Sequence, residues 1–311
     1  MQDAKQLAGV LAALVLGACG EGDLLTLGER TELPVAAGEF GNVVRVEEVS
    51  VGGEDDENPT LTDDMLQIYF NSERDGGADG SDVWFAERSS LDEDFGEPRP
   101  LGGWSDEGSD SSPAVSGDGL TLWLAHEVES DGDSEATTDV RMVVRETTSE
   151  PDWQGPVSVQ GLNTSADERP RPLGQGGVVM PLSRRVETDA GDTLWQTLLA
   201  RRVGDAEFSE PVLLSELVEP DVSVVDGFLS FDGLTLVFKY QPPDEDGDLY
   251  WAKRSSVDAA FVGATAVPGA DVNTDADERD PWLSPDGTVL YFASDREGDA
   301  MDVFRAELVS D

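Results

Sequence analysis

The chain of 311 residues has few of the side chains on which much protein chemistry depends. It contains one cysteine, Cys19, and one histidine, His126. A single cysteine excludes a disulfide bond within the chain. A single histidine excludes a histidine-rich zinc or manganese site, and without a Gly-x-Ser-x-Gly motif it does not indicate a Ser-His-Asp triad. We therefore expect no catalytic residue and no such metal site, and we assign His126 to packing within the fold.

Basic residues are also scarce. There are 20 of them, only three being lysine, against 66 acidic residues, so the net charge is −46 and the pI about 4.1. A surface this acidic repels nucleic acid phosphates and anionic lipid headgroups, so we expect no nucleic acid partner. The charge favours solubility or adaptation to a salty or cation-rich setting. With so many carboxylates, no particular acid–base pair can be identified.

Long hydrophobic runs are absent except near the start. Residues 7–18 are an uncharged apolar run of twelve, too short to cross a bilayer, which takes about 20 residues, but as long as a signal-peptide core. The run ends in Leu16-Gly-Ala-Cys19, which resembles the lipobox of bacterial lipoproteins, although Asp3 in the leader departs from the usual basic start. A plain secretory signal or an ordinary apolar N-terminus is the alternative.

This resemblance implies three segments and a location. Residues 1–18 would be a lipoprotein signal peptide, Cys19 the lipidated first residue, and residues 19–39 a tether. Lipid attachment would be the protein's only contact with the membrane. Gly20 after the cysteine favours the outer membrane, so we expect a cell-envelope protein on the periplasmic face or the cell surface.

Glycine and acidic turn residues, by contrast, are plentiful and recur at regular distances. Residues 281–296 predict a strand, a tight turn at Asp286-Gly287 and a second strand, because Asp-Gly between apolar runs is typical of a hairpin. The same frame occurs five times, 54 to 57 residues apart. Its turn residues are Asp64, Asp118, Gln175, Asp232 and Asp286. A period near 55 over five copies indicates a repeat architecture.

Two further motifs complete each period. An apolar strand follows an acidic residue at 82–86, 139–143, 248–252 and 302–306, with 194–200 in the same place of the third repeat. An aromatic residue before a turn and a short strand follows at 95–98, 153–156, 208–211 and 261–264. Four short strands in about 55 residues, without a convincing helix, are typical of one β-propeller blade.

The chain ends predict how the ring closes. The fifth period stops soon after its second motif, whereas residues 40–49 form a third motif with no hairpin before it. We therefore predict that residues 40–49 supply the outer strand of the last blade and pair with residues 302–307, which removes an exposed strand edge. The fold is predicted to be all-β, a five-bladed β-propeller over residues 40–311, with six blades as the alternative.

The motifs Leu-Ser-Pro-Asp-Gly (283–287), Tyr-Phe-Ala-Ser-Asp-Arg (291–296) and Asp-Val-Phe (302–304) resemble the WD-like repeat of TolB-type propellers. Serine and arginine recur eight and ten residues after the turn in three repeats, at 72 and 74, 183 and 185, and 294 and 296. Together with the lipobox, the repeats are most similar to lipoproteins of myxobacteria and related Gram-negative bacteria. The resemblance implies the fold and says little about function.

Three acidic loops and two charged groups are candidate sites. Calcium suits closely spaced carboxylates with glycines, as at 75–82, 129–135 and 244–248, although flexible acidic loops are the alternative. We expect no cofactor unless these loops hold calcium. Asp-Glu-Arg recurs at 167–169 and 277–279, and its arginines are predicted to pair with nearby acids or, as the second option, to line the central channel.

We therefore predict a monomeric, non-enzymatic scaffold that binds a protein or a glycan of the cell envelope through loops on one face. The alternative is a carbohydrate-active propeller, either a glycoside hydrolase or a lectin. A convergence of carboxylates and exposed tryptophan would distinguish them, because a glycan site needs an aromatic platform. The sequence does not identify the ligand-binding residues.

Overall fold

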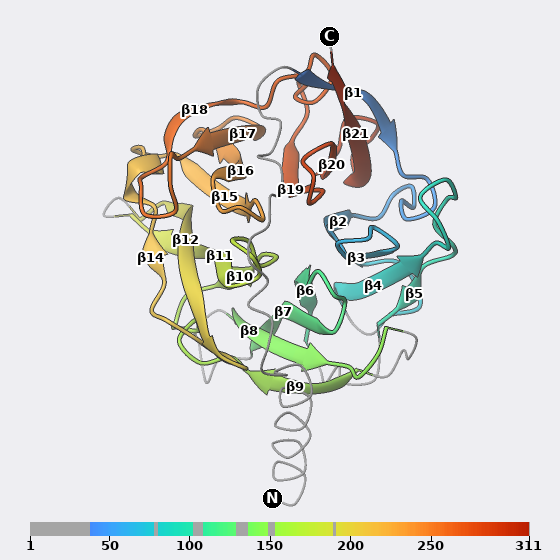
Figure 1. Cartoon of the computed structure of the whole chain (residues 1–311), viewed down its shortest axis with the longest axis horizontal. Helices are drawn as coiled ribbons and strands as arrows, with labels where there is room; N and C mark the ends of the chain where they lie inside the picture. The colour runs from blue at the N-terminus through green and yellow to red at the C-terminus, as the bar shows by residue number, and fades with distance from the viewer. Residues whose placement is uncertain are drawn as a thin grey trace, which may run out of the picture.

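The computed structural model describes residues 38–77, 80–101, 108–128, 136–148, 153–188 and 191–310. In these residues the chain forms five antiparallel sheets arranged in a ring, so the predicted all-β, five-bladed propeller is confirmed (Figure 1). The described part contains one short 3-10 helix, Ser215–Leu217. No helix within it is long and apolar enough to cross a membrane. Cys19 and the predicted signal peptide lie outside the described residues.

Each blade is named here from its inner strand outward. Blade 1 consists of β2 (Asp56–Leu61), β3 (Gln67–Ser72), β4 (Asp82–Glu87) and β5 (Arg99–Pro100). Blade 2 consists of β6 (Asp110–Val115), β7 (Thr121–Val128), β8 (Thr137–Val144) and β9 (Gln154–Ser158). Blade 3 consists of β10 (Glu168–Pro170), β11 (Val179–Glu187), β12 (Thr193–Gly204), β13 (Glu207–Phe208) and β14 (Val212–Leu213). Blade 4 consists of β15 (Ser223–Leu229), β16 (Thr235–Gln241), β17 (Asp248–Lys253) and β18 (Val262–Ala266). Blade 5 consists of β19 (Glu278–Leu283), β20 (Val289–Ser294), β21 (Asp302–Ser310) and β1 (Gly38–Arg45).

The two ends of the chain meet in blade 5. Strand β1 pairs antiparallel with β21, with Phe40 opposite Leu308 and Val44 opposite Arg305. The predicted closure by the N-terminal strand is therefore confirmed, although the strand covers residues 38–45 and not the predicted 40–49. Phe40, Val46 and Val49 are buried in the cluster that also holds Phe292 and Phe304 of blade 5, so the closing segment contributes to the core.

In four of the five blades, a hydroxyl and a carboxylate shape the turn of the first hairpin. In four blades a Ser or Thr hydroxyl donates to the Asp two residues later, as Ser284 does to Asp286 at 2.6 Å. The next residue adopts a positive φ, which glycine tolerates best: φ is 74° at Gly287. The repeated Asp-Gly pair thus shapes the turn, as its sequence indicates.

In blade 3 the predicted turn residue, Gln175, is wrong by one position. Glu168 pairs with Arg184 as Glu278 pairs with Ser294, which makes Gly176 the equivalent of Asp286. The error arises because Pro170 looks equivalent to Pro281, whereas it takes the place of Asp280. The blade is also wider than predicted, since β13 and β14 both pair with β12.

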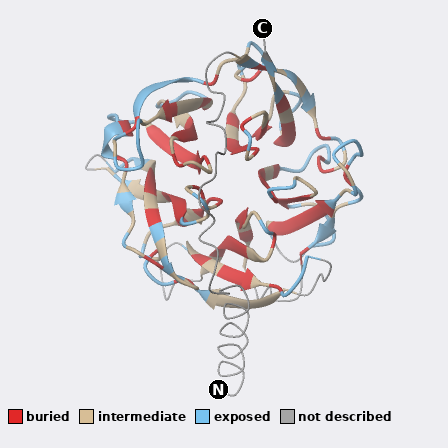
Figure 2. Ribbon diagram, in the orientation of Figure 1, coloured by how far each residue is buried: buried red, intermediate tan, exposed pale blue. Residues whose placement is uncertain are grey.

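The core lies within and between the blades. Buried residues concentrate on the inner three strands and exposed ones on the outer strands and loops (Figure 2). The largest cluster joins blades 1, 4 and 5 across their interfaces. Aromatic rings fill it at two contacts, Trp282 against Phe228 of blade 4 and against Tyr291 of its own blade, with centroids 6.1 and 5.9 Å apart. Burial on this scale stabilises the ring, since each large apolar side chain contributes about 1.5–3 kcal/mol.

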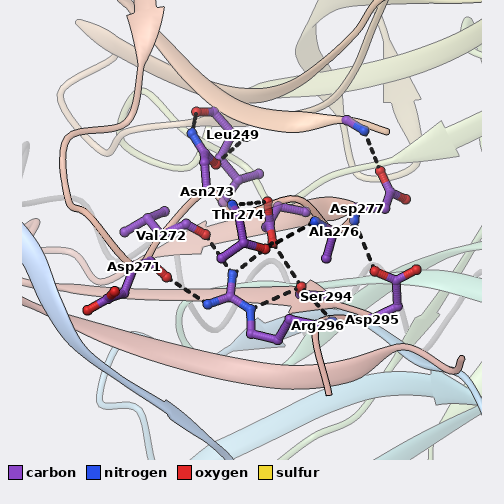
Figure 3. A network of polar contacts seen from close by, with 12 residues as sticks. Leu249, Asp271, Val272, Asn273, Thr274, Ala276, Asp277, Ser294, Asp295 and Arg296 are labelled. Carbon is purple, nitrogen blue, oxygen red and sulfur yellow. Dashed lines mark hydrogen bonds and ion pairs between the residues drawn. The ribbon is translucent and has the colours of Figure 1, made fainter. Parts of the chain in front are cut away.

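Asparagine side chains fasten two of the blade junctions. Asn273 accepts a hydrogen bond from Leu249 N at 2.8 Å and donates one to Leu249 O at 3.0 Å, which links the loop before blade 5 to strand β17 of blade 4 (Figure 3). Asn163 makes the same pair of bonds with Val140, between blades 3 and 2. In each case the next residue, Thr274 or Thr164, donates to the first glutamate of the inner strand.

Candidate functional site

The acidic residues that begin four inner strands have structural partners. Asp56 bonds Arg74, Glu168 bonds Arg184 and Glu278 bonds Arg296, and each of these acids is buried. Figure 3 shows how Arg296 also donates to Ser294 and to two carbonyl oxygens. In blade 3 the partner is Arg184, whereas Arg185, the arginine of the recurrent serine–arginine spacing, pairs with Asp167. These acids hold the inner strands within their own blades and are not open to a ligand.

His126 fits the same pattern. Its Nδ1 lies 2.8 Å from Asp110 Oδ1, and both residues are buried in blade 2. The pair occupies the place that Glu278 and Ser294 fill in blade 5. His126 therefore lies in the interior of blade 2, paired with Asp110.

A group of buried polar side chains meets at the propeller axis. We call Asn58, Arg171, Asp226 and Asp280, which come from blades 1, 3, 4 and 5, the axial cluster; all are less than 6% exposed. Arg171 Nη1 donates to Asn58 Oδ1 at 2.6 Å and to Asp280 Oδ1 at 3.0 Å. Arg171 therefore ties three blades together at the centre.

Backbone conformation explains why these residues reach the axis. Asn58, Asp226 and Asp280 have φ near 55°, at bulges where the register of the inner strand shifts. Pro170 holds the equivalent place in blade 3 and cannot adopt a positive φ, because its ring fixes φ near −65°. The strand takes another path there, and the next residue, Arg171, supplies the cation at the axis.

The axial cluster has two carboxylates for one arginine. Asp226 Oδ1 is buried and has no hydrogen-bond partner among the described residues. Burial raises the pKa of Asp280 to about 7, and the nearby Asp226 carboxylate adds to the effect while Arg171 opposes it. Asp280 therefore keeps its proton to a higher pH than an exposed aspartate does, which lowers the electrostatic cost of holding both acids at the axis.

A second set of charged residues lies where the inner strands begin, at one end of the axis. We call Glu57, Arg169, Asp277 and Arg279 the axial mouth; they come from blades 1, 3 and 5 and are partly exposed or near the surface. Arg279 forms ion pairs with Glu57 at 3.0 Å and with Asp277 at 3.3 Å. Burial raises the pKa of Glu57, whereas Arg279 and Arg169 lower it. The arginines of both Asp-Glu-Arg groups thus reach the axis, as the second predicted option has it, and Arg279 also pairs with the nearby Asp277, as the first option has it.

An aromatic side chain adjoins the axial mouth. The guanidinium carbon of Arg169 lies 4.2 Å from the ring centroid of Trp195, a half-buried residue of β12. A shallow hollow between blades 3 and 4 continues from Trp195 and is lined by Leu194, Val218 and Val222 among others. Carboxylates and a partly exposed tryptophan therefore do converge at this end of the axis.

The opposite end of the axis is apolar. A small hollow there is lined by five equivalent residues, one from each blade, that lie five positions after the equivalent of Glu278; they are Leu61, Val115, Leu173, Leu229 and Leu283. Phe228 and Trp282 pack beside them. Because this end offers a ring of packed leucine and valine side chains, the polar axial mouth is the end suited to specific recognition.

Of the three predicted calcium loops, only 244–248 lies wholly within the described residues. Residues 129–135 and part of 75–82 lie outside the described residues. Loop 244–248 is described, and no group of three or more acidic, histidine or cysteine side chains in the described ranges has a geometry suited to a metal ion. Calcium binding by the acidic loops remains a prediction.

Comparison with known proteins shows the fold. No protein-family model and no curated protein sequence matches the chain. A putative TolB from Agrobacterium tumefaciens has a TM-score of 0.52 at 11% identity, over 86% of both chains. An endo-arabinase from Bacteroides thetaiotaomicron has a TM-score of 0.55 at 11% identity, over 86% of this chain and 97% of that one. The chain spans 55% of a TolB from Acinetobacter baumannii, with 16% identity and a TM-score of 0.46. TolB-like propellers are thus among its structural neighbours, and so are glycoside hydrolases.

Most of the axial residues could not be predicted from the sequence. The Asp-Glu-Arg repeats pointed to Arg169 and Arg279, but nothing in the local sequence distinguishes Glu57, Arg171 or Trp195 from other residues of their types. A longer repeat was present as a signal: Asn-Thr-x-Ala-Asp-Glu-Arg occurs at 163–169 and at 273–279.

Proposed function

We propose that this protein is a non-enzymatic binding module whose ligand docks at the axial mouth. The observation that carries the proposal is the position of Arg279 between the two mouth carboxylates, Glu57 and Asp277. Glycoside hydrolysis uses two carboxyl groups about 5–9.5 Å apart with the scissile bond between them. Here a guanidinium occupies that position and neutralises both acids, so the arrangement suits recognition better than bond cleavage.

The surroundings of the mouth also favour binding. Arg169 offers hydrogen-bond donors, Glu57 offers acceptors, and Trp195 offers an apolar surface, which together resemble the mixture of groups found in ligand sites. The ligand would be a protein or a glycan of the cell envelope. Attachment through Cys19 would hold the propeller at the membrane, with the mouth free to face its ligand, and Gly20 after the cysteine favours the outer membrane.

The alternative is a carbohydrate-active propeller. One observation favours it: Glu57 is partly exposed, burial raises its pKa, and a tryptophan lies in the same region, as a general acid in a sugar site would require. The endo-arabinase among the structural neighbours has the same kind of fold, which by itself assigns no activity.

Two measurements test the proposal. A pulldown from cell envelopes compares the natural protein with Ser111→Trp, because Ser111 takes the place in blade 2 that Glu57 has in blade 1 and a larger side chain there would obstruct the mouth. We expect Ser111→Trp to lose the captured ligand while retaining its melting temperature. Release of sugars from arabinan by the natural protein, abolished in Glu57→Gln, would replace the binding proposal with the hydrolase.

A further inference from the structure

We propose that the axial mouth recognises a saccharide by a carboxylate group, and that Arg169 is the residue that binds this carboxylate. The inference rests on the proposed function and narrows it to a class of ligand: a glycan that carries a uronic acid unit.

Arg169 differs from the other arginines at the axis. Arg171 pairs with Asp280 and Arg279 pairs with Glu57, each at 3.0 Å. Within the described part of the chain, the side chain of Arg169 forms no hydrogen bond and no ion pair, and its close contact is the ring of Trp195. It is also partly exposed, so its donors are open to a ligand.

Stacking on Trp195 prepares Arg169 for a planar acceptor. A guanidinium that lies 4.2 Å from a ring centroid gains a cation–π interaction while the N–H groups on its edge stay available. Those N–H groups form a rigid fork that matches the two oxygens of a carboxylate. Because the stack fixes the plane of the guanidinium beforehand, less side-chain entropy is lost when a carboxylate binds.

The surface beside Arg169 favours a sugar over a peptide. The hollow that continues from Trp195 is lined by Val218, Val222 and Glu219. Tyr240 donates to Glu219 at 2.9 Å and stacks on Tyr250 with centroids 4.7 Å apart, which places a hydroxyl, a carboxylate and aromatic rings at its edge. Apolar faces with polar groups at the rim complement the C–H faces and hydroxyls of a sugar ring.

The net charge restricts the ligand further. A protein with a charge of −46 repels a polyanion at long range, although salt screens the repulsion beyond about 8–10 Å. The ligand is therefore a mostly neutral oligosaccharide with an isolated uronic acid unit, in preference to a chain in which every unit is charged.

The test is an array of oligosaccharides with single uronic acid units, each beside its carboxyl-reduced form, in which CH2OH replaces the carboxylate. A set of aspartate- and glutamate-containing peptides completes the array. We expect the natural protein to bind at least one acidic oligosaccharide about 10-fold or more tightly than its reduced form, as expected for hydrogen bonds to a charged group.

Variants assign the preference to one residue. Arg169→Gln should remove it, and Arg169→Lys should restore part of it, because lysine keeps the charge but not the fork. Arg201→Gln is the matched control, an exposed arginine of the same blade, and should leave the preference unchanged. Unaltered melting temperatures would show that the Arg169 variants remain folded.

Three results would overturn the inference: equal affinity for acidic and reduced forms, including no binding to either; binding of acidic peptides in place of saccharides; or an intact preference in Arg169→Gln. Each of these results differs from the result that would refute the proposed function. The proposed function fails if Ser111→Trp still captures the ligand from envelopes. Glycan binding that disappears in Ser111→Trp without any preference for carboxylate would keep the function and discard the uronic acid.

Discussion

Burying a carboxylate at the centre of a protein costs little free energy only if its charge is paired with a cation or removed by protonation. Both conditions are met in part at Asp280. It accepts a hydrogen bond from Arg171 at 3.0 Å, yet burial and the Asp226 carboxylate raise its pKa to about 7. In an unfolded chain the pKa would be about 3.9. The folded protein therefore binds this proton more tightly, and the stability that the proton confers is lost as pH rises from about 4 through about 7.

This linkage predicts the behaviour of Asp280→Asn. Asparagine keeps an oxygen for Arg171 but does not titrate, so the variant should lose less stability between pH 5 and pH 8 than the natural protein does. Urea unfolding midpoints at several pH values measure the difference. The exposed Asp299→Asn is the control and should follow the natural protein. Parallel curves for the natural protein and Asp280→Asn would mean that Asp280 does not titrate in this range.

Cys19 supports a second prediction about a single residue, made from the sequence because the position lies outside the described residues. If Cys19 carries the lipid, Cys19→Ser should be found in the soluble fraction or remain uncleaved. Partitioning into Triton X-114 measures this. Detergent-phase partitioning equal to that of the natural protein would contradict lipid attachment, since stable anchoring depends on the acyl chains.

At the level of the elements, two blade junctions are stabilised by the hydrogen bonds of an asparagine side chain. Asn273→Ala removes two hydrogen bonds and leaves the N–H and C=O of Leu249 without this partner. We expect a loss of about 1–3 kcal/mol in the free energy of unfolding. Asn163→Ala should cause a similar loss at the junction of blades 2 and 3, and the two losses should add, because the sites share no partner. A loss of stability in only one of the two variants would show that the two asparagine side chains do not stabilise their junctions equally.

The elements were predictable from the sequence because their signals are local. Each Asp-Gly turn and each apolar run identifies a strand within a few residues, and the unmatched segment 40–49 identifies the closing strand. The third blade was misaligned because Pro170 was taken as the equivalent of Pro281, although proline occupies there a place that needs a positive φ elsewhere.

The candidate site was less predictable, since it depends on which side chains meet when the ring closes. Glu57 and Arg279 are 222 residues apart in sequence and 3.0 Å apart in space. Likewise, Asn58, Arg171 and Asp280 are ordinary polar residues of three separate repeats. No spacing rule within one repeat predicts their contact, because the contact crosses the axis.

The whole molecule depends on the pairing of its two ends. Deleting residues 20–35 leaves β1 intact and should change the melting temperature little. Deleting residues 20–50 removes Phe40, Val46 and Val49 from the core and exposes the edge of β21. At about 1.5–3 kcal/mol for each buried side chain, the loss is comparable with the total stability of a typical domain, about 5–15 kcal/mol.

We therefore expect the longer deletion to aggregate or to be degraded, which expression and thermal melting measure. A soluble, cooperatively melting protein without residues 20–50, with a midpoint near that of the shorter deletion, would contradict closure through β1.

The central claim is that ligand enters at the axial mouth, and photocrosslinking tests it directly. A benzophenone amino acid is placed at Asp275, an exposed residue two positions before Asp277 of the mouth, or at Asp63, an exposed residue of the hairpin turn at the opposite end of the axis. After irradiation with envelope extract, we predict a crosslinked ligand from position 275 and none from position 63. Crosslinking from position 63 alone would contradict the account, because it would place the binding surface on the apolar end of the propeller.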